Sequence, residues 1–311
     1  MINTNNRLII PAQPQILSAD GIQDRAKRVF DLLDISENTR QDYKYRIGLF
    51  LEFVRKNGIG INSYLEFKRY LVNRTDLSVS TKNKYLATAK IFLKELSRQG
   101  VIPSDITQNI KVFSQDKKHK RDGLNQEEIN KLVEQLKQLP VTPQNARLKA
   151  IFSLLALQGL RQIEIVRLEV KEIDLVSKTA FVQGKGRDDK ELIDLHPETI
   201  KALRDYLKAN KKSSGPLFTC QSNNHLNQRL TTRAIRQIVT RTLRKLGIDK
   251  STHGFRHYFT TTLIRTYKGD LLEVAQYTRH KGLEMLQVYN DSIKKQADLP
   301  RYYSAFKGVG F

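Results

Sequence analysis

Apolar side chains recur at helical spacing in the first third of the chain. From about residue 40 they fall on one face of an amphipathic helix, at Tyr43, Ile47, Phe50, Leu51 and Val54. Ser36 and Asn38 come just before this face and are candidate helix caps. A second strong helix is predicted over 81–98, and weaker helical patterns cover 22–33 and 63–73. Together these elements predict a small helical bundle.

A polar, highly charged segment, SQDKKHKRDG (114–123), interrupts this pattern and is typical of a linker. Helical periodicity then resumes, with a buried helix predicted over 145–159. The period changes in VKEIDLV, TAFVQ and KELIDL, which predict three antiparallel strands across about 170–195. GKGRDD (184–189) forms the tip of the second hairpin, and helices return after Pro197.

The fold class that follows is mainly α with a small antiparallel β-sheet. We expect a flexible N-terminus (1–18), a helical domain (19–113), a linker (114–123) and an α+β domain with a C-terminal tail (124–311). The chain of 311 residues is long enough for two domains of ordinary size.

Charge narrows the class of partner. Lys and Arg outnumber Asp and Glu by 54 to 32, a formal net charge of +22, so a polyanion is expected, with nucleic acid as the leading candidate. The single Cys220 excludes a disulfide within the chain and a zinc site built from cysteines. No signal-peptide pattern opens the chain, and no apolar run approaches the ~18 residues that span a bilayer. These features predict a cytoplasmic protein without membrane association.

One predicted helix, 232–246, separates apolar from basic residues. Its apolar face carries Ile235, Ile238, Val239 and Leu246, whereas four arginines occupy the opposite side over an arc of roughly 140° at helical spacing: Arg233, Arg236, Arg241 and Arg244. A solvated helix face usually mixes charges of both signs. An all-arginine face is better explained by contacts to phosphates, although a merely solvated surface remains the alternative.

Four short stretches carry candidate chemistry. They are QGLRQIE with Arg161 and Glu164, QGKGRDD with Lys185, THGFRHYFTT with His253 and Arg256, and RHKGLEMLQVYND with His280 and Tyr289. Each stretch alone is weak, because such arginines and lysines are usually solvated and a helical tyrosine usually packs. The two histidines spaced i, i+4 in THGFRH do not complete a zinc motif, since Gly254 stands where HExxH needs glutamate.

As a set, these side chains are more informative. Two arginines, a lysine, two histidines and a tyrosine, without a carboxylate cluster, suit transfer at a phosphodiester better than Mg²⁺-dependent chemistry, which needs Asp or Glu ligands. Guanidiniums can grip the phosphate oxygens, and a tyrosine can attack phosphorus to form a covalent intermediate. Histidine and lysine can move the protons. We therefore expect no cofactor, metal or ATP.

At these motifs the chain resembles the tyrosine recombinase (phage integrase) family. QGLRQIE is similar to its first arginine box, GKG to its β-hairpin lysine, HGFRH to its H-x-L-R-H box and HKGLEMLQVY to its histidine–tyrosine ending. Two N-terminal stretches, SENTRQDYKYRIGLFLEFV and LSVSTKNKYLATAKIFLKEL, resemble helices of its core-binding (SAM-like) DNA-binding domain. The resemblance covers about residues 20–295, with the simple two-domain architecture of Xer-type members.

The resemblance implies a role for each matched residue. Tyr289 would attack the scissile phosphate and form a 3′-phosphotyrosyl bond, while Arg161 and Arg256 clamp that phosphate. Lys185 would protonate the departing 5′ oxygen, and His253 would assist proton transfer at the tyrosine.

The same resemblance implies that His280 hydrogen-bonds a non-bridging oxygen and that Glu164 supports Arg161. The two domains would form a C-shaped clamp on double-stranded DNA with inverted-repeat core sites, and a homotetramer would join two such sites. Accessory DNA-bending or directionality proteins are possible partners. The protein would be prokaryotic and nucleoid-associated when bound to DNA. Further candidate DNA contacts are Lys82 and Lys84.

The chain departs from the family pattern in three places. Gln158 replaces the usual threonine, Phe255 the usual leucine and Arg279 the glycine before His280. None of these changes removes a candidate catalytic group, but Arg279 puts the role of His280 in doubt. The tail YYSAFKGVGF is expected to pack on a neighbouring subunit, with packing on its own domain as the alternative.

The expected function is a site-specific DNA recombinase that breaks and rejoins DNA. Integration or excision of a mobile element and resolution of DNA dimers are not separable at this level. Two alternatives remain: a catalytically idle DNA-binding or architectural protein of the same fold, and a type IB-like DNA topoisomerase.

Overall fold

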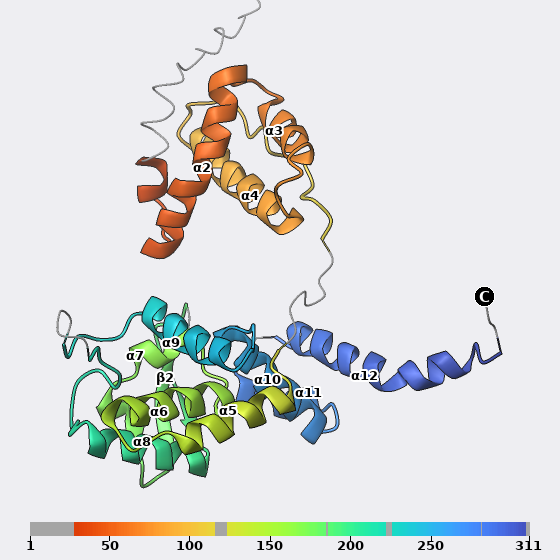
Figure 1. Ribbon diagram of the computed structural model, residues 1–311. Helices are drawn as coiled ribbons and strands as arrows, with labels where there is room; N and C mark the ends of the chain where they lie inside the picture. Colours follow the sequence, from red (N-terminus) through yellow and green to blue (C-terminus); the bar gives the residue numbers. More distant parts are fainter. Residues whose placement is uncertain (1–27, 116–122, 185, 222–225, 281, 309–311) are drawn as a thin grey trace, which may run out of the picture. The chain divides into compact units, whose positions relative to one another are not determined.

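The chain forms two compact units in a computed structural model (Figure 1). The structure describes residues 28–115, 123–184, 186–221, 226–280 and 282–308. The units are Met1–Asp116 and Lys117–Phe311, so the division between them falls inside the 114–123 segment. Each unit is described by itself, as an N-terminal unit and a C-terminal unit.

The N-terminal unit is helical, as its apolar periodicity predicted. Its main helices are α2 (Glu37–Asn57), α3 (Ser63–Val72) and α4 (Val79–Arg98). Their core is rich in aromatic rings that are almost fully buried: Phe30, Phe50, Tyr64, Phe67 and Phe92. This dense packing of large apolar surfaces stabilises the bundle.

A serine side chain sets where α2 begins. Ser36 accepts a hydrogen bond from the backbone N–H of Thr39, and α2 therefore starts at Glu37, about three residues earlier than the pattern predicted. Asn38, the other candidate cap, lies inside the helix. Of the weak helix expected over 22–33, residues 28–31 are helical and the positions before them lie outside the described residues.

The C-terminal unit begins with helices that pack around one apolar core. They are α5 (Gln126–Gln138), α6 (Pro143–Leu157) and, after the sheet, α8 (Pro197–Ala209). Thr142 caps α6 and Pro143 occupies its first turn, where the missing N–H costs nothing. The helix ends at Leu157, two residues before the predicted end, and Gly159 follows in the left-handed region with φ 58°.

A three-stranded antiparallel sheet lies between these helices in the sequence. Its strands are β1 (Ile173–Asp174), β2 (Thr179–Gln183) and β3 (Lys190–Asp194), in the order β1-β2-β3. The pair Gln183↔Lys190 closes the second hairpin, which places 184–189 at its tip as predicted. Strand β1 is shorter than expected because Val170–Glu172 forms a 3-10 turn instead.

Five further helices complete the C-terminal unit: α7 (Gln162–Arg167), α9 (Thr232–Lys245), α10 (Thr252–Thr266), α11 (Leu271–Thr278) and α12 (Glu284–Ser304). Helix α10 packs against α6, α11 and α12. The second half of α12 extends away from the rest of this unit (Figure 1) and is largely exposed, including Tyr302 and Tyr303.

The predicted fold class, mainly α with a small antiparallel sheet, is confirmed. Within the described ranges, no helix combines the length and apolar character that crossing a bilayer requires.

Candidate active site

The first arginine box forms a sharp connection between α6 and α7. Arg161 is the residue that precedes α7, and its backbone N–H donates to Oε2 of Glu164 at 2.8 Å. Its side chain donates from Nη1 to Oε1 of the same carboxylate at 2.9 Å. Glu164 is buried whereas the side chain of Arg161 is 36% exposed, so the carboxylate anchors one end of a guanidinium that still faces outward.

Gly159 makes this connection possible. A Cβ added there would lie 2.3 Å from Cδ1 of Phe259, and its positive φ already favours glycine. The glycine in QGLR thus lets the backbone come close to α10, which carries Phe259 and the second candidate arginine.

Arg256 is held from two directions inside the unit. Its Nη1 donates to the carbonyl of Gly159 at 2.8 Å, and its Nη2 donates to the carbonyl of Thr278 at 2.5 Å. The residue is only 3% exposed, and burial, followed by the nearby charge of Arg161, lowers its pKa to about 10. Both of these partners are neutral carbonyls, so this buried cation lies in surroundings that favour the arrival of an anion.

Tyr289 lies in the second turn of α12 and is 5% exposed. Burial raises the pKa of its phenol to about 12, while the positive charges of Arg256 and Arg161 act in the opposite direction. The structure therefore brings the candidate nucleophile and both candidate phosphate clamps within electrostatic range of one another.

Two histidines of α10 lie in a row beside the tyrosine. The ring of His257 contacts Tyr289 edge-on, with centroids 4.6 Å apart, and the His253 ring lies 5.3 Å from His257. His253, the residue singled out in the sequence, is exposed, whereas His257 is buried. No role was predicted for His257 from the sequence. Its position one helical turn after His253 was the feature that could have indicated a place in the same site.

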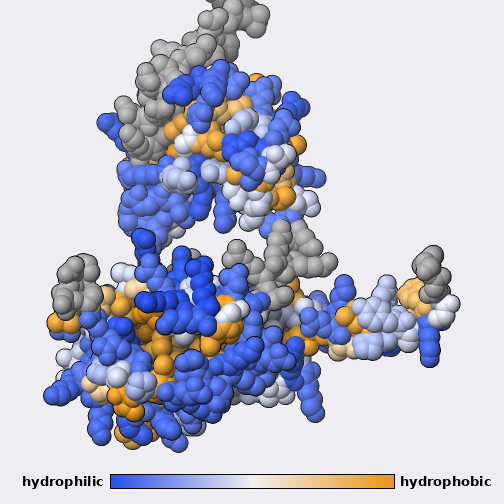
Figure 2. All heavy atoms as spheres, in the orientation of Figure 1, coloured by the Kyte–Doolittle hydropathy of each residue, from blue (hydrophilic) through white to orange (hydrophobic). Residues whose placement is uncertain are grey.

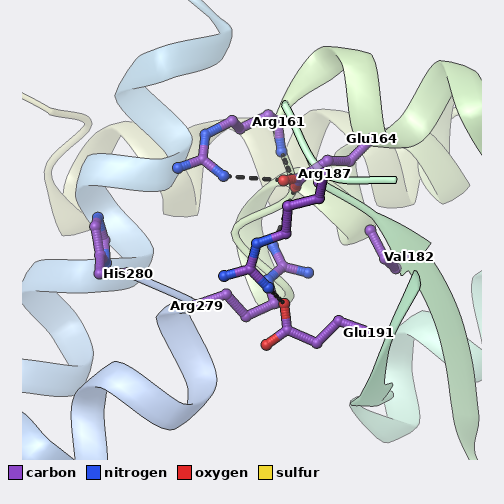
Figure 3. Close-up of a pocket in the computed structure, with 8 residues that line it drawn as sticks. Arg161, Glu164, Val182, Arg187, Glu191, Arg279 and His280 are labelled. Carbon is purple, nitrogen blue, oxygen red and sulfur yellow. Dashed lines mark hydrogen bonds and ion pairs between the residues drawn. The ribbon is translucent and has the colours of Figure 1, made fainter. Parts of the chain in front are cut away.

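His280 follows the end of α11. Its Nδ1 lies 2.7 Å from Oγ1 of Thr278, a contact that orients the ring. His280 lines a cavity of about 260 Å³ together with Arg161, Arg187 and Arg279 (Figure 3). Its three guanidiniums outnumber the two carboxylates that also line it, those of Glu164 and Glu191, so the cavity is suited to bind an anionic group.

The β2–β3 hairpin supplies another wall of this cavity. Gly184 lines it and accepts a hydrogen bond from Nη1 of Arg167 at 3.0 Å, while Arg187 pairs with Glu191 at 2.6 Å (Figure 3). Lys185, the predicted proton donor, lies outside the described residues. Arg187 was not singled out from the sequence, although its charge in the same hairpin tip was a visible signal. Thr278 was not singled out either, and no sequence pattern indicated that Thr278 would contact Arg256 and His280.

The basic face of α9 is present as predicted. Arg233, Arg236, Arg241 and Arg244 are all exposed, while Ile235, Val239 and Leu243 are buried, and Figure 2 shows hydrophilic side chains over the visible side of this helix. In the N-terminal unit Lys84 is exposed, whereas Lys82 donates to the carbonyl of Val72 at 3.0 Å.

Residues 123–296, more than half of the chain, match the Phage integrase family. The chain belongs to this family. Its sequence motifs and helix-rich C-terminal unit are thereby explained, and the recombinase resemblance noted in the sequence is confirmed.

Curated members of the family are similar over most of the chain. "Tyrosine recombinase XerC" of Lactobacillus delbrueckii subsp. bulgaricus is 28% identical over 223 residues, covering 68% of this chain and 72% of the relative. "Tyrosine recombinase XerC" of Leptospira interrogans is 25% identical over 296 residues, covering 90% and 92%.

Solved structures share the fold. XerH site-specific recombinase bound to palindromic difH substrate, a post-cleavage complex, matches with a TM-score of 0.70 at 20% identity, covering 91% of this chain and 84% of that one. A lambda integrase tetramer bound to a Holliday junction matches with a TM-score of 0.67 at 13% identity, covering 88% and 78%.

Proposed function

We propose that Tyr289 is the nucleophile with which this chain, a site-specific DNA recombinase of the tyrosine type, breaks and rejoins DNA. The phenolic oxygen attacks the scissile phosphorus, a P–O bond to tyrosine forms, and the P–O5′ bond breaks. The DNA is left with a 3′-phosphotyrosyl end and a free 5′ hydroxyl. Attack by a 5′ hydroxyl on the phosphotyrosine reverses these steps and restores a phosphodiester.

The observation that carries this proposal is the surroundings of Arg256. A buried guanidinium held by two neutral carbonyls lies within electrostatic range of Arg161 and of Tyr289. A phosphate at this point would supply the negative charge that Arg256 lacks. As attack proceeds, negative charge grows on the phosphate oxygens, and two fixed guanidiniums stabilise that charge without reorganisation.

Proton transfers accompany the two bond changes. We assign acceptance of the Tyr289 proton to His253, whose ring lies next to that of His257, and protonation of the departing 5′ oxygen to Lys185. His280, oriented by Thr278, donates to a non-bridging oxygen from the cavity wall. Glu164 holds Arg161 in place through its backbone and its side chain. This set uses no ATP, because the bond energy is kept in the phosphotyrosine.

The partner in this reaction is double-stranded DNA with inverted-repeat core sites, joined in pairs by a homotetramer. The net charge of +22 and the exposed arginines of α9 support DNA binding, and a neighbour of the same fold is a tetramer on a Holliday junction. The XerC relatives favour a simple Xer-type recombinase, acting on DNA in the bacterial cytoplasm, with accessory DNA-binding proteins setting direction.

The test is a nicked suicide substrate built from the chain's own recombination junction and incubated in EDTA. Cleavage should release a short fragment and trap a covalent protein–DNA adduct. Tyr289→Phe should abolish the adduct while leaving DNA binding intact. Tyr206→Phe is the matched control, because Tyr206 is also buried with its pKa raised to about 12 but its hydroxyl donates to the Leu217 carbonyl. An adduct that persists in Tyr289→Phe would falsify the nucleophile assignment.

The same assay addresses the two alternatives from the sequence. An idle DNA-binding protein would bind the substrate without forming an adduct. A topoisomerase would relax supercoiled plasmids that lack the junction, whereas the proposed recombinase acts only where its core sites are present.

A further inference from the structure

Arg279 occupies a backbone position that disfavours it. It is the residue that ends α11, with φ 55° and ψ 41°, in the left-handed region where glycine is usual. The family pattern has glycine before the histidine. A glycine would therefore satisfy the backbone better than arginine does, which directs attention to the contacts of the Arg279 side chain.

The side chain of Arg279 turns inward to the cavity wall (Figure 3). It is 5% exposed, and its Nη2 donates to Oε2 of Glu164 at 3.1 Å. Among the described residues, neither its Nε nor its Nη1 has a hydrogen-bond partner. Burial lowers its pKa; the negative charges of Glu164 and Glu191 oppose this effect, whereas the positive charges of Arg161 and Arg187 add to it. Simple packing does not account for a buried, incompletely paired cation at a strained position.

The Arg279 side chain shares the carboxylate of Glu164 with Arg161. Oε1 of Glu164 accepts from Nη1 of Arg161, whereas Oε2 accepts from the backbone of Arg161 and from Arg279. Arg279 thus fixes the carboxylate from a segment 115 residues further along the chain. With Oε2 occupied in this way, Glu164 holds Arg161 through one side-chain nitrogen.

We propose that Arg279 is a positioning residue that sets the direction of the Arg161 guanidinium through Glu164. The inference rests on the proposed function, in which Arg161 grips the scissile phosphate. Without Arg279, Oε2 loses a charged donor and the Arg161 guanidinium rotates to pair with both carboxylate oxygens. That rotation withdraws nitrogen atoms from the phosphate, and a displacement of about 1 Å is enough to slow a reaction by ~10²-fold.

The alternative to action through Glu164 is a direct contact between Arg279 and the phosphate. Its two unpartnered nitrogens are closed off from solvent, and its side chain is 5% exposed compared with 36% for Arg161. The arrangement therefore favours action through Glu164 over direct contact.

The experiment uses the full chain and single-turnover cleavage of the suicide substrate, with DNA affinity measured separately. Arg279→Gly suits the backbone and removes the guanidinium, so the fold should persist while cleavage slows by about 10- to 100-fold at unchanged DNA affinity. Arg279→Lys, which keeps a cation able to reach Glu164, should restore part of the rate. Lys268→Gly is the matched control, because Lys268 has φ 51° but an exposed side chain; its cleavage rate should not change.

A double-mutant cycle distinguishes action through Glu164 from direct contact with the phosphate. If Arg279 acts through Glu164, Arg279→Gly should change the rate by less than about threefold once Glu164→Gln is present. Fully multiplicative effects, or a wild-type rate in Arg279→Gly, would overturn the inference. The proposed function fails differently, through a missing adduct in the wild type or an adduct that survives Tyr289→Phe.

Discussion

Tyr64 in the N-terminal unit and Tyr289 in the C-terminal unit are similar by burial and different by charge. Tyr64 is fully buried, Tyr289 is 5% exposed, and burial raises the pKa of each phenol to about 12. Around Tyr64 the next influence is the negative charge of Asp105, which raises the pKa further. Around Tyr289 it is the positive charge of Arg256 and Arg161, which opposes the effect of burial.

The difference shows that burial alone does not separate a packing tyrosine from a reactive one. The hydroxyl of Tyr64 donates to the Leu86 carbonyl within a core of aromatic rings, where a phenolate would have no support. Tyr289 lies where a phenolate, or a phosphate bound to it, meets two guanidiniums. The surroundings of Tyr64 stabilise the neutral phenol, whereas the positive charges near Tyr289 favour a negatively charged group.

The largest expected effect is on the aromatic core. Phe67 on α3 is fully buried, with its ring centroid 5.0 Å from that of Phe50. Phe67→Ala should lower the free energy of unfolding of the N-terminal unit by about 3–5 kcal/mol, because the cavity cannot collapse fully. Hydrogen exchange resolved by unit measures this, with Val72→Ala, exposed on the same helix, as the control. Equal losses of hydrogen-exchange protection in both units would contradict the expectation that this core stabilises the N-terminal unit alone.

Arg256→Ala should have the opposite effect: a large loss of cleavage with little loss of stability. Cleavage of the suicide substrate should fall by about 10²–10³-fold, the usual cost of removing one fixed donor to developing negative charge. Thermal stability should change little, because the variant loses two hydrogen bonds but also a buried charge that Glu164 compensates only in part. Arg147→Ala is the matched control: burial also lowers the pKa of Arg147, and its Nη1 donates to the Thr219 carbonyl. A loss of cleavage explained by unfolding would refute this balance.

Alkaline pH should distinguish the folded and unfolded states through the phenol of Tyr289. The folded-state pKa of Tyr289 is raised to about 12, above the ordinary tyrosine pKa of about 10, so the stability it contributes is present below pH 10 and is lost as pH rises towards 12. Denaturant unfolding of wild type and Tyr289→Phe should therefore diverge by about 2 kcal/mol between pH 9 and pH 12, with the phenylalanine variant losing less. A difference that is constant with pH would argue against the raised pKa.

The smallest effect is expected at the exposed arginines of α9. Arg233→Ala should reduce the slope of log affinity against log salt by about 1, because one phosphate contact is lost. The rate of cleavage at saturating protein should stay the same. Arg204→Ala, an exposed arginine on α8, provides a control that removes the same charge from another helix. A slope that changes equally in both variants would indicate a diffuse effect of net charge.

Local patterns in the sequence were sufficient for the helices and for the candidate residues of the site. The spacing of Ile47, Phe50 and Val54 predicted the buried face of α2, and the motifs around Arg161, Arg256 and Tyr289 indicated residues that the structure brings together. Each of these signals lies within a few residues of chain.

Contacts between distant segments could not be predicted in this way. The pairing of Arg279 with Glu164 depends on the left-handed turn after α11 and on how α7 packs, and no spacing in the sequence records either. The edge-on contact of His257 with Tyr289 likewise depends on how α10 meets α12. Strand β1 was predicted too long because Val170–Glu172 forms a 3-10 turn, which alternation alone does not reveal.

The two carbonyl contacts of Arg256 also bear on when, during folding, the site becomes complete. The Arg256 guanidinium joins a carbonyl 97 residues before it in the chain to one 22 residues after it. A nascent or partly folded chain lacks at least one of these partners, and its guanidinium then remains solvated and free to turn. If Arg256 grips the scissile phosphate as proposed, we expect the capacity to cut DNA to appear only once both of these contacts have formed.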